Sequence, residues 1–243
     1  VAVHLNDLSL QIGTVSVLKA LNGQLPLHGC SVLLGANGSG KSSLLGVIQG
    51  LLKPTGGSMR LAGLPDRSAG TVPGLARQFA TVFQRPVMLR RSVLANVKHA
   101  LACAGVSRAM RAEQALSALR DVGLEHLAAR AAPSLSGGEQ QRLAIARASA
   151  LNPMCLLCDE PTASLDPGAA AEVERLLMRL GGAGKGLIMA THDLAQARRM
   201  ADYVVFMHQG QIRGHGPAQP FFDQPSDPVA ARFLRGELVG NSI

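Results

Sequence analysis

The sequence predicts an α/β domain with a parallel-sheet core, an N-terminal antiparallel β portion and an inserted α-helical subdomain. Several observations support this fold class. A glycine-rich loop at residues 35–40 stands between a strand-like run and a helix-like run. A continuous apolar run at 154–158 is typical of a strand covered on both faces. Residues 91–150 change to Ala, Leu and Arg with helical spacing, which indicates helices inserted between strands.

The chain length of 243 residues allows one large α/β domain, or one core with a small inserted subdomain. We expect a single domain over residues 1–243, with a core of about 1–84 and 151–243 and a helical insertion of about 85–150. Hydrophobic residues make up 47% of the chain and aromatic residues 3%. We therefore expect a sizeable core that is filled mainly by aliphatic side chains and alanine.

Composition also limits the function classes. The N-terminus lacks the pattern of a secretory signal and no uninterrupted apolar stretch approaches about 18 residues, so we expect a soluble, cytoplasmic chain. The four cysteines fit a reducing compartment better than a disulfide framework. The formal charge of +8 is compatible with nucleic acid or an anionic membrane surface. A solvated basic face explains this charge more simply, so it decides nothing.

Short β-type runs occupy the first part of the chain at Val3–Leu5, Val15–Leu18 and Ser31–Leu34. The third run leads directly into the glycine-rich loop, and Lys41–Gln49 then has the apolar pattern of a helix. Strand, loop and helix in this order form the context that a phosphate-binding loop requires. Thr81–Phe83 is predicted as another short strand, closed by polar residues and a proline.

The inserted part is predicted to contain two helical segments. Ser107 is expected to cap the first, which runs to about Val122 with Met110, Leu116 and Leu119 on one side. The second lies further along the chain and leads back to the sheet.

This second helical segment covers Glu139–Ala150. The apolar run Met154–Cys158 follows and is predicted as a buried strand. Asp166 and the proline after it have the N-cap and first-turn pattern of a further helix. Gly186–Thr191 and Val204–Met207 are predicted as two more buried strands, whereas about the last 20 residues carry no clear pattern.

The glycine-rich loop has the spacing Gly35-x4-Gly40-Lys41-Ser42. Its glycines allow backbone N–H groups to turn inward around the β- and γ-phosphates of a nucleotide. Lys41 adds a mobile positive charge, Ser42 a hydroxyl for Mg²⁺, and the following helix its positive dipole end. A merely structural glycine loop is the alternative, but the flanking strand and helix favour binding of a nucleoside triphosphate.

Two adjacent carboxylates, Asp159 and Glu160, stand at the end of the buried run. Proteins of the α/β class place ligands at such strand ends, and paired carboxylates there are costly without a cation or proton to share. Asp159 suits Mg²⁺, directly or through water, and Glu160 suits polarising the attacking water. A helix cap or a salt-bridged acid pair is the alternative interpretation.

A third motif, Ser136-Gly137-Gly138-Glu139, has two compatible interpretations. The pattern Ser-x-x-Glu is a capping box, which opens a helix with two reciprocal hydrogen bonds. The two glycines weaken a first helical turn unless something must approach the backbone closely. An anion at this helix end would meet bare N–H groups and the helix dipole.

Some positions carry weaker signals. His192 and Gln84 each stand just past a predicted strand, where they could reach a phosphate, Mg²⁺ or the attacking water. Cys155 and Cys158 have redox or metal-ligand spacing, but they lie inside the apolar run and no matching Cys/His pair completes a metal site. We interpret the two cysteines as small buried strand residues.

In this order the motifs resemble the nucleotide-binding subunit of an ABC (ATP-binding cassette) transporter, whose fold is a P-loop NTPase with a RecA-like core. The resemblance runs from about Leu8 to Gly214. The segments that carry it are Gly35–Ser42 (Walker A), Gln84 (Q-loop), Leu135–Gln140 (signature sequence), Met154–Asp159 (Walker B) with Glu160 as catalytic base, Ser164–Asp166 (D-loop) and His192 (switch histidine).

The resemblance implies an ATP hydrolase that works as a head-to-tail dimer around two ATP molecules. It implies Glu160, His192 and Gln84 as catalytic residues, and Ser42, Gln84 and Asp159 as the residues near Mg²⁺. Each ATP would contact both subunits. The contacts would come from Gly35, Asn37, Gly38, Ser39, Gly40, Lys41, Ser42 and Ser43 of one subunit, and from Ser136, Gly137 and Gly138 of the second copy.

The resemblance also implies membrane partners. Hydrolysis would open the dimer, and Gln84 with the helical insertion would pass this motion to transmembrane permease subunits through a hinge near residues 84–90. The chain would then lie in the cytoplasm, peripherally on the inner face of the cell membrane. An extracytoplasmic solute-binding protein would be an indirect partner, and no nucleic acid is expected.

Two details refine the resemblance. Residues 82–92 are similar to the corresponding stretch of bacterial tungstate importer ATPases, within the molybdate/tungstate/phosphate-type importers, which implies import of a small solute such as an oxyanion. The family usually stacks an aromatic ring on adenine upstream of Walker A, whereas this sequence has Ile12 there. A looser selection between ATP and GTP is therefore expected.

Other functions stay open at this point. The same ATPase could drive export or lipid handling, although the sequence near Gln84 favours import. A non-transport ABC ATPase acting on nucleic acid or ribosomes generally carries long coiled coils or tandem cassettes, which this sequence lacks. A regulatory module without turnover is disfavoured because Glu160, Gln84 and His192 are all present.

Overall fold

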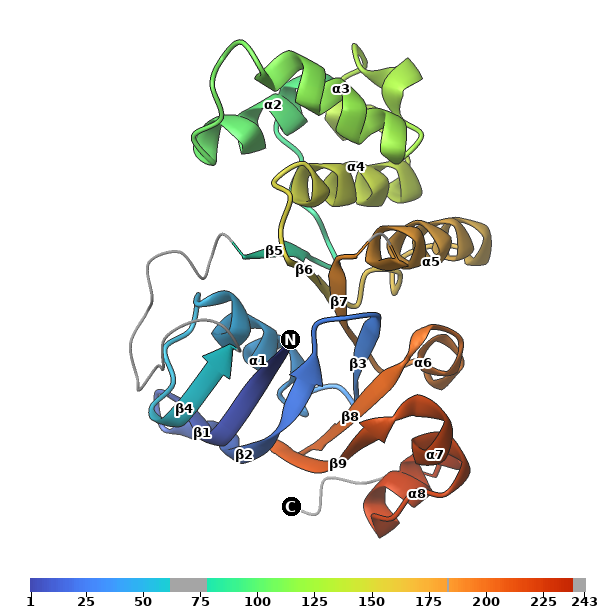
Figure 1. The fold of residues 1–243 in the computed structure, drawn as a ribbon. Helices are drawn as coiled ribbons and strands as arrows, with labels where there is room; N and C mark the ends of the chain where they lie inside the picture. The colour runs from blue at the N-terminus through green and yellow to red at the C-terminus, as the bar shows by residue number, and fades with distance from the viewer. Residues whose placement is uncertain (62–77, 183, 238–243) are drawn as a thin grey trace.

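The computed structural model describes residues 1–61, 78–182 and 184–237, which form two sheets flanked by helices (Figure 1). The larger sheet has the strand order β5-β6-β7-β3-β8-β9. Its strands are β3 (Cys30–Leu34), β5 (Phe79–Val82), β6 (Cys155–Asp159), β7 (Gly186–Thr191), β8 (Tyr203–His208) and β9 (Gln211–Pro217). All neighbouring strands in it pair in parallel except β8 and β9, which pair antiparallel. The predicted parallel-sheet core is confirmed.

The smaller sheet is antiparallel and has the strand order β2-β1-β4. Its strands are β1 (Ala2–Ile12), β2 (Val15–Pro26) and β4 (Gly56–Leu61). The predicted antiparallel portion is confirmed, but the first strand is much longer than the expected run. The reason is an irregularity at Asp7, whose φ of 48° and shifted register let the strand continue past polar residues.

The helix α1 (Lys41–Gln49) has the predicted bounds, and its apolar side chains lie in a core that both sheets share. The strand β3 is buried on both faces, as parallel strands in this class usually are. Leu33 contributes to the core shared with α1, whereas Val32 and Leu34 contribute to a second core on the opposite face.

Helices cover this second face. They include α2 (Val93–Cys103), α3 (Arg111–Asp121), α4 (Gly137–Ser149), α5 (Pro167–Gly182) and α6 (Leu194–Met200), with short 3₁₀ turns η1 (Glu125–Leu127) and η2 (Ala132–Ser134). Figure 1 shows α2 and α3 together at one end of the molecule, with α4 between them and the sheet. The boundary of the helical insertion at about 85–150 stays a prediction. No helix in the described ranges combines the length and the apolar character needed to cross a bilayer.

The prediction for the first inserted helix is wrong at its start. The helix α3 begins at Arg111, and Ser107 does not cap it. The carbonyl of Ser107 instead accepts a hydrogen bond from the N–H of Met110 in a turn that precedes the helix, and the Met110 side chain is 52% exposed. Leu119 is buried as expected.

The sequence pattern also does not separate α2 as an element of its own. Its only clear start signal is Ser92, whose hydroxyl accepts a hydrogen bond from the N–H of Ala95. The strand β2 also continues well past the predicted run Val15–Leu18, and β5 ends at Val82, which leaves Phe83 outside the strand and half exposed. The bounds of β6, β7, β8 and α4, and the start of α5, lie within two residues of the predicted ones.

The C-terminal segment packs onto the core through two helices that the sequence did not predict, α7 (Ala218–Asp223) and α8 (Pro228–Leu234). The buried ring of Phe206 in β8 lies with its centroid 6.5 Å from that of Phe221 and 5.2 Å from that of Phe233. Aromatic residues are few in this chain, and this group ties the segment to the sheet.

We predict that Phe206→Ala lowers the free energy of unfolding by about 3–5 kcal/mol, because it removes a fully buried ring that contacts both C-terminal helices. Urea-induced unfolding followed by circular dichroism measures this change. Met178→Ala, at a side chain that is 39% exposed, is the control and should change the free energy by less than about 1 kcal/mol. An equal loss in both variants would contradict the role of this aromatic group.

Candidate active site

The carboxyl ends of β6, β7 and β3 meet at one edge of the larger sheet. The three strands are neighbours, and the register pairs Leu34, the last residue of β3, with Thr191, the last residue of β7. The glycine-rich loop follows Leu34, and His192 follows Thr191. Asp159 ends β6 beside them, and Glu160 comes next. Parallel pairing therefore gathers chemically active groups from three distant segments, where α/β sheets usually bind ligands.

Lys41 lies at the first position of α1 and is 5% exposed. Its Nζ donates hydrogen bonds to the carbonyl oxygens of Gly35 (2.7 Å) and Ala36 (2.9 Å) and lies 3.9 Å from Glu160 Oε1. Burial lowers the pKa of Lys41, and the carboxylates of Glu160 and Asp159 oppose this shift. The loop thus holds a buried ammonium group beside the carboxylates at the sheet edge.

Gly35 and Gly40 are required by close packing as well as by backbone conformation. A Cβ atom at Gly35 would overlap the carbonyl oxygen of Met207 in β8. Gly40 has a φ of 102°, and a Cβ there would lie 2.8 Å from a methyl group of Leu18 in β2. In the described part of the chain, Ser39 Oγ in this loop is a buried polar atom without a hydrogen-bond partner. The loop is seated tightly on the strands beneath it.

Ser42 and Asp159 act on one another at this edge: burial raises the pKa of Asp159, and hydrogen bonding by the Ser42 hydroxyl opposes this shift. A hydroxyl and a carboxylate oxygen match the ligands that Mg²⁺ takes, and a cation here would favour the ionised carboxylate. No group of three His, Cys, Asp or Glu residues in the described ranges could hold a metal by itself. The oxygen donors of Ser42 and Asp159 are of the kind that suits Mg²⁺.

Glu160 and His192 are in direct contact, with 2.9 Å between Oε1 and Nδ1. Glu160 has a φ of 45°, in the left-handed region that costs a non-glycine residue about 1–3 kcal/mol. Its N–H donates to the carbonyl of Ala190 at 3.0 Å, which stabilises this conformation. The strained backbone places the carboxylate within reach of both His192 and Lys41.

Ser136 caps the helix α4, and the predicted capping box is confirmed. Ser136 Oγ accepts from the N–H of Glu139 (3.4 Å), and Glu139 Oε2 accepts from the N–H of Ser136 (2.7 Å). A Cβ at Gly138 would lie 2.9 Å from the Cβ of Ala169 in α5, so a neighbour within the same chain explains this glycine in part. Among the described residues, no hydrogen bond or ion pair joins Ser136 to Lys41.

Gln84 and Ile12 lie apart from the contacts described above. Gln84 follows β5 as predicted, and its side chain is exposed. No hydrogen bond within the described ranges brings it to Asp159 or Glu160. Ile12 ends β1 and is 51% exposed, so an aliphatic surface is available where the family usually has an aromatic ring.

Cys155 and Cys158 are fully buried on opposite faces of β6. Cys155 belongs to the core shared with α1 and Cys158 to the helix-covered core. Burial raises the pKa of Cys155 to about 12 and that of Cys158 well above its ordinary value. The interpretation as small buried strand residues is confirmed.

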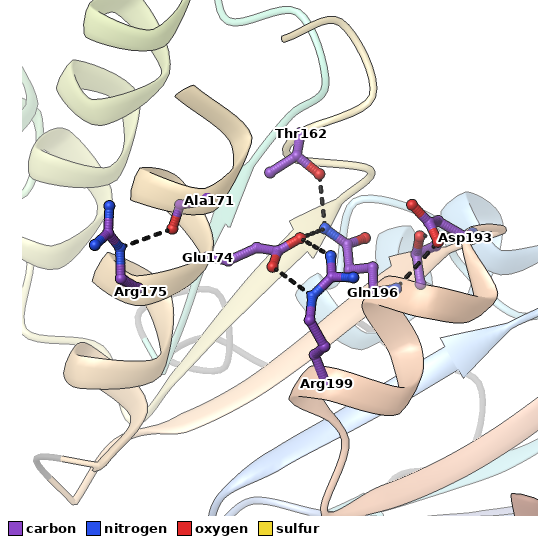
Figure 2. Close-up of polar contacts among 8 residues, drawn as sticks. Thr162, Ala171, Glu174, Arg175, Asp193, Gln196 and Arg199 are labelled. Carbon is purple, nitrogen blue, oxygen red and sulfur yellow. Dashed lines mark hydrogen bonds and ion pairs between the residues drawn. The ribbon is translucent and has the colours of Figure 1, made fainter. Parts of the chain in front are cut away.

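A polar network that no sequence motif predicted lines the same cavity as Glu160 and His192, and Figure 2 shows its contacts. It is formed by Thr162, Glu174, Gln196 and Arg199 from the loop after β6 and the helices α5 and α6. An N-cap signal was available, because Asp193 stands directly before the run that forms α6. No spacing rule connects Glu174 with Thr162, since tertiary packing alone brings them together.

Comparison with known proteins decides the family. Residues 18–163, more than half of the chain, match the family model described as ABC transporter. The chain belongs to this family. The ABC cassette is 35% identical over 247 residues to the histidine/lysine/arginine/ornithine transport ATP-binding protein HisP of Escherichia coli (strain K12), covering 96% of each chain.

Two further relatives of the cassette are named for inorganic anions. Phosphate import ATP-binding protein PstB 2 of Natronomonas pharaonis is 37% identical over 218 residues, which is 85% of this chain and 77% of that protein. Tungstate uptake system ATP-binding protein TupC of Peptoclostridium acidaminophilum is 36% identical over 191 residues, which is 78% of this chain and 85% of that protein.

Solved structures of ABC cassettes have the same fold. For cbiO1 from Clostridium perfringens, part of the ABC transporter complex cbiONQ, the TM-score is 0.83 at 28% identity, covering 96% of this chain and 94% of that one. For the dimeric post-hydrolysis state of the cassette MJ0796 bound to ADP and Pi, the TM-score is 0.76 at 28% identity, covering 89% and 99%. The predicted P-loop NTPase fold is confirmed, and the cassette is an ABC-type ATPase.

We predict that Lys41→Ala weakens binding of ATP to the cassette about 10-fold to 100-fold, because it removes a charged donor worth about 1.5–3 kcal/mol. Isothermal titration calorimetry with ATP and Mg²⁺ measures the dissociation constant. Lys53→Ala, at an exposed lysine beyond α1, is the matched control and should leave the constant unchanged. Unchanged affinity in Lys41→Ala would contradict phosphate binding by this loop.

Proposed function

We propose that this chain is the ATP-binding subunit of an ABC importer and hydrolyses ATP to drive the entry of a small solute. The observation that carries this proposal is the convergence of Lys41, Ser42, Asp159, Glu160 and His192 at one sheet edge. The relatives named for transport, import and uptake support import over export or lipid handling. They also favour a transport role over action on nucleic acid or ribosomes.

Each side chain at the sheet edge has a role in this proposal. Lys41 and the N–H groups of the loop bind the β- and γ-phosphates, with Asn37, Gly38, Ser39 and Ser43 as neighbouring contacts. Ser42 and Asp159 hold Mg²⁺, which supplies charge neutralisation to the phosphates when bound. Gln84 would supply a further oxygen to the metal or the water.

Glu160 acts as the general base in this proposal. Its Oε1 takes the proton of the attacking water, and the hydrogen bond to His192 Nδ1 orients the carboxylate. Its φ of 45°, held by the hydrogen bond from its N–H to the Ala190 carbonyl, directs the carboxylate toward His192 and Lys41. His192 keeps a 46% exposed side chain, which leaves it accessible to a γ-phosphate.

We propose further that two copies form the head-to-tail dimer. Ser136, Gly137 and Gly138 at the N-terminus of α4 then bind the γ-phosphate held by the loop of the second copy. Two facts support this. The capping box leaves other N–H groups of the first turn of α4 without an intrahelical partner, and a similar cassette has a dimeric structure with ADP and Pi.

The membrane partners are part of the proposal. Residues 85–150 form the inserted helical subdomain, and the half-exposed Phe83 and the 78% exposed Val87 beside Gln84 are available for contact with a permease. The cassette would lie in the cytoplasm on the inner face of the membrane, with a solute-binding protein as an indirect partner. No nucleic acid takes part.

The transported solute is proposed to be an oxyanion such as tungstate. The sequence of residues 82–92 supports this choice, and so do the relatives TupC and PstB 2. HisP has similar identity and is named for amino acids, so the competing outcome is an amino acid importer. Purifying the complete transporter and measuring which solute stimulates its ATPase activity separates tungstate, molybdate and phosphate from basic amino acids.

We predict that Glu160→Gln lowers kcat for ATP hydrolysis at least about 100-fold, because the amide cannot accept the proton of the attacking water. ATP affinity should stay near the wild-type value, and an ATP-bound dimer should become detectable by size-exclusion chromatography. Release of phosphate measures kcat. Hydrolysis near the wild-type rate would contradict Glu160 as the base.

We predict that Ser136→Asp abolishes the ATP-bound dimer of the Glu160→Gln variant and also lowers the stability of the cassette, because a carboxylate cannot donate to Glu139 Oε2 as the Ser136 hydroxyl does at 2.9 Å. Aspartate still accepts from the helix N–H groups as serine does, but its charge repels a γ-phosphate from the second copy. Ser136→Asn, a neutral cap, is the matched control and should keep the dimer. A dimer that forms equally with aspartate would contradict the proposed arrangement.

A further inference from the structure

A buried carboxylate links two segments that carry the active groups (Figure 2). Glu174 in α5 is 9% exposed and faces α6. Its Oε1 accepts hydrogen bonds from Gln196 Nε2 (3.0 Å) and Arg199 Nη2 (2.9 Å), and its Oε2 accepts from Arg199 Nε (3.2 Å). The side chain of Arg199 is 56% exposed, so its guanidinium lies between the Glu174 carboxylate and the solvent. The charge of Glu174 is thereby balanced and its orientation fixed.

Gln196 uses both hydrogens of its side-chain amide. Nε2 donates to Glu174 Oε1 and, at 2.7 Å, to the hydroxyl oxygen of Thr162. The opposite orientation of the amide would place its oxygen against the Glu174 carboxylate, so the acceptors themselves determine which way it points. Gln196 is 3% exposed, which makes an unpaired amide hydrogen costly.

Thr162 and Gln196, which this hydrogen bond joins, each follow an active group closely in the sequence. Thr162 is two residues after Glu160, and Gln196 is four residues after His192. The N–H of Gln196 donates to Asp193 Oδ1 at 3.0 Å, so the residue that follows His192 is tied to the same helical turn. We refer to the contact Glu174–Gln196–Thr162 as the α5–α6 bridge.

Pairing of β6 with β7 and the hydrogen bond from the Glu160 N–H to the Ala190 carbonyl hold the first residues of these two segments together, but packing beyond them leaves space. A cavity of about 570 Å³ lies between them and is lined by Glu160, Thr162, His192, Gln196 and Arg199, among others. Side chains and loops beside such a space can shift without a steric clash, whereas close-packed ones cannot. The hydrogen bonds of the α5–α6 bridge therefore restrain the distance between the loop after β6 and the start of α6.

We propose that Gln196, oriented by Glu174, is a positioning residue that sets the alignment of Glu160 with His192 for ATP hydrolysis. This inference rests on the proposed function, because it concerns the step that Glu160 performs. The hydrogen bonds of the α5–α6 bridge involve Thr162, Gln196 and Glu174 and neither Lys41 nor Ser42, so we expect the bridge to act on the chemical step more than on ATP binding. Loss of the α5–α6 bridge lowers kcat and leaves the KM for ATP near the wild-type value.

The test compares Thr162→Val with Thr162→Ser in the full chain. Valine has nearly the shape of threonine but removes the acceptor, whereas serine keeps it. We expect Thr162→Val to lower kcat about 10-fold to 100-fold, the range for a small misplacement of catalytic groups. We expect Thr162→Ser to retain at least about half of the activity, with ATP affinity and melting temperature similar in both variants.

A second variant tests Gln196, the central residue of the bridge. Gln196→Met should reproduce the effect of Thr162→Val on kcat. Arg213→Met, which breaks the Arg213–Asp227 ion pair far along the chain, is the control for loss of a polar contact and should keep kcat and KM.

The outcomes separate the two hypotheses. Wild-type hydrolysis that is lost in Glu160→Gln but fully kept in Thr162→Val would overturn the bridge and leave the proposed function intact. A fall in kcat that only parallels a fall in melting temperature, or that is the same in Thr162→Ser, would also overturn it. A wild-type chain that does not hydrolyse ATP would overturn both.

Discussion

Parallel pairing of β6, β7 and β3 is the constraint on which the site depends. Each of these short strands is buried on both faces, and each ends where the chain turns into a polar loop. Because the strands start and end together, the loop at 35–40, the carboxylates after β6 and His192 arrive at one edge without any direct link along the chain. The two hydrophobic cores keep this edge in place by holding the sheet from both sides.

The charged groups where the carboxyl ends of β6, β7 and β3 meet must also balance one another. Burial penalises the charged forms of Lys41 and Asp159, so it lowers the pKa of Lys41 and raises that of Asp159. Their contacts with Glu160 and Ser42 offset part of this penalty. A triphosphate with a divalent cation would add charges of both signs at the same place, which explains why such a costly group of residues suits nucleotide binding.

The helix α4 shows how one motif can serve structure and function together. The capping box at Ser136 and Glu139 stabilises the start of the helix, and Gly138 allows the close approach of α5. Both features are intramolecular, so they neither require nor oppose a second copy of the chain. The proposal of an intermolecular phosphate contact depends instead on the N–H groups that remain at this helix end and on the dimeric relative.

The sequence by itself determined the local elements and the chemistry of each motif. Lys41–Gln49 and Gly186–Thr191 have the predicted bounds, because apolar patterning and glycine signals are local properties. It also identified Glu160 and His192 as separate candidates, but not their 2.9 Å contact. The prediction at Ser107 was wrong because a turn, closed by the hydrogen bond from the Met110 N–H to the Ser107 carbonyl, precedes the helix that begins at Arg111. Only the tertiary structure decided the strand order, the packing of α7 and α8, and the link from Glu174 through Gln196 to Thr162, since these contacts join segments far apart in the chain and leave no periodic trace in it.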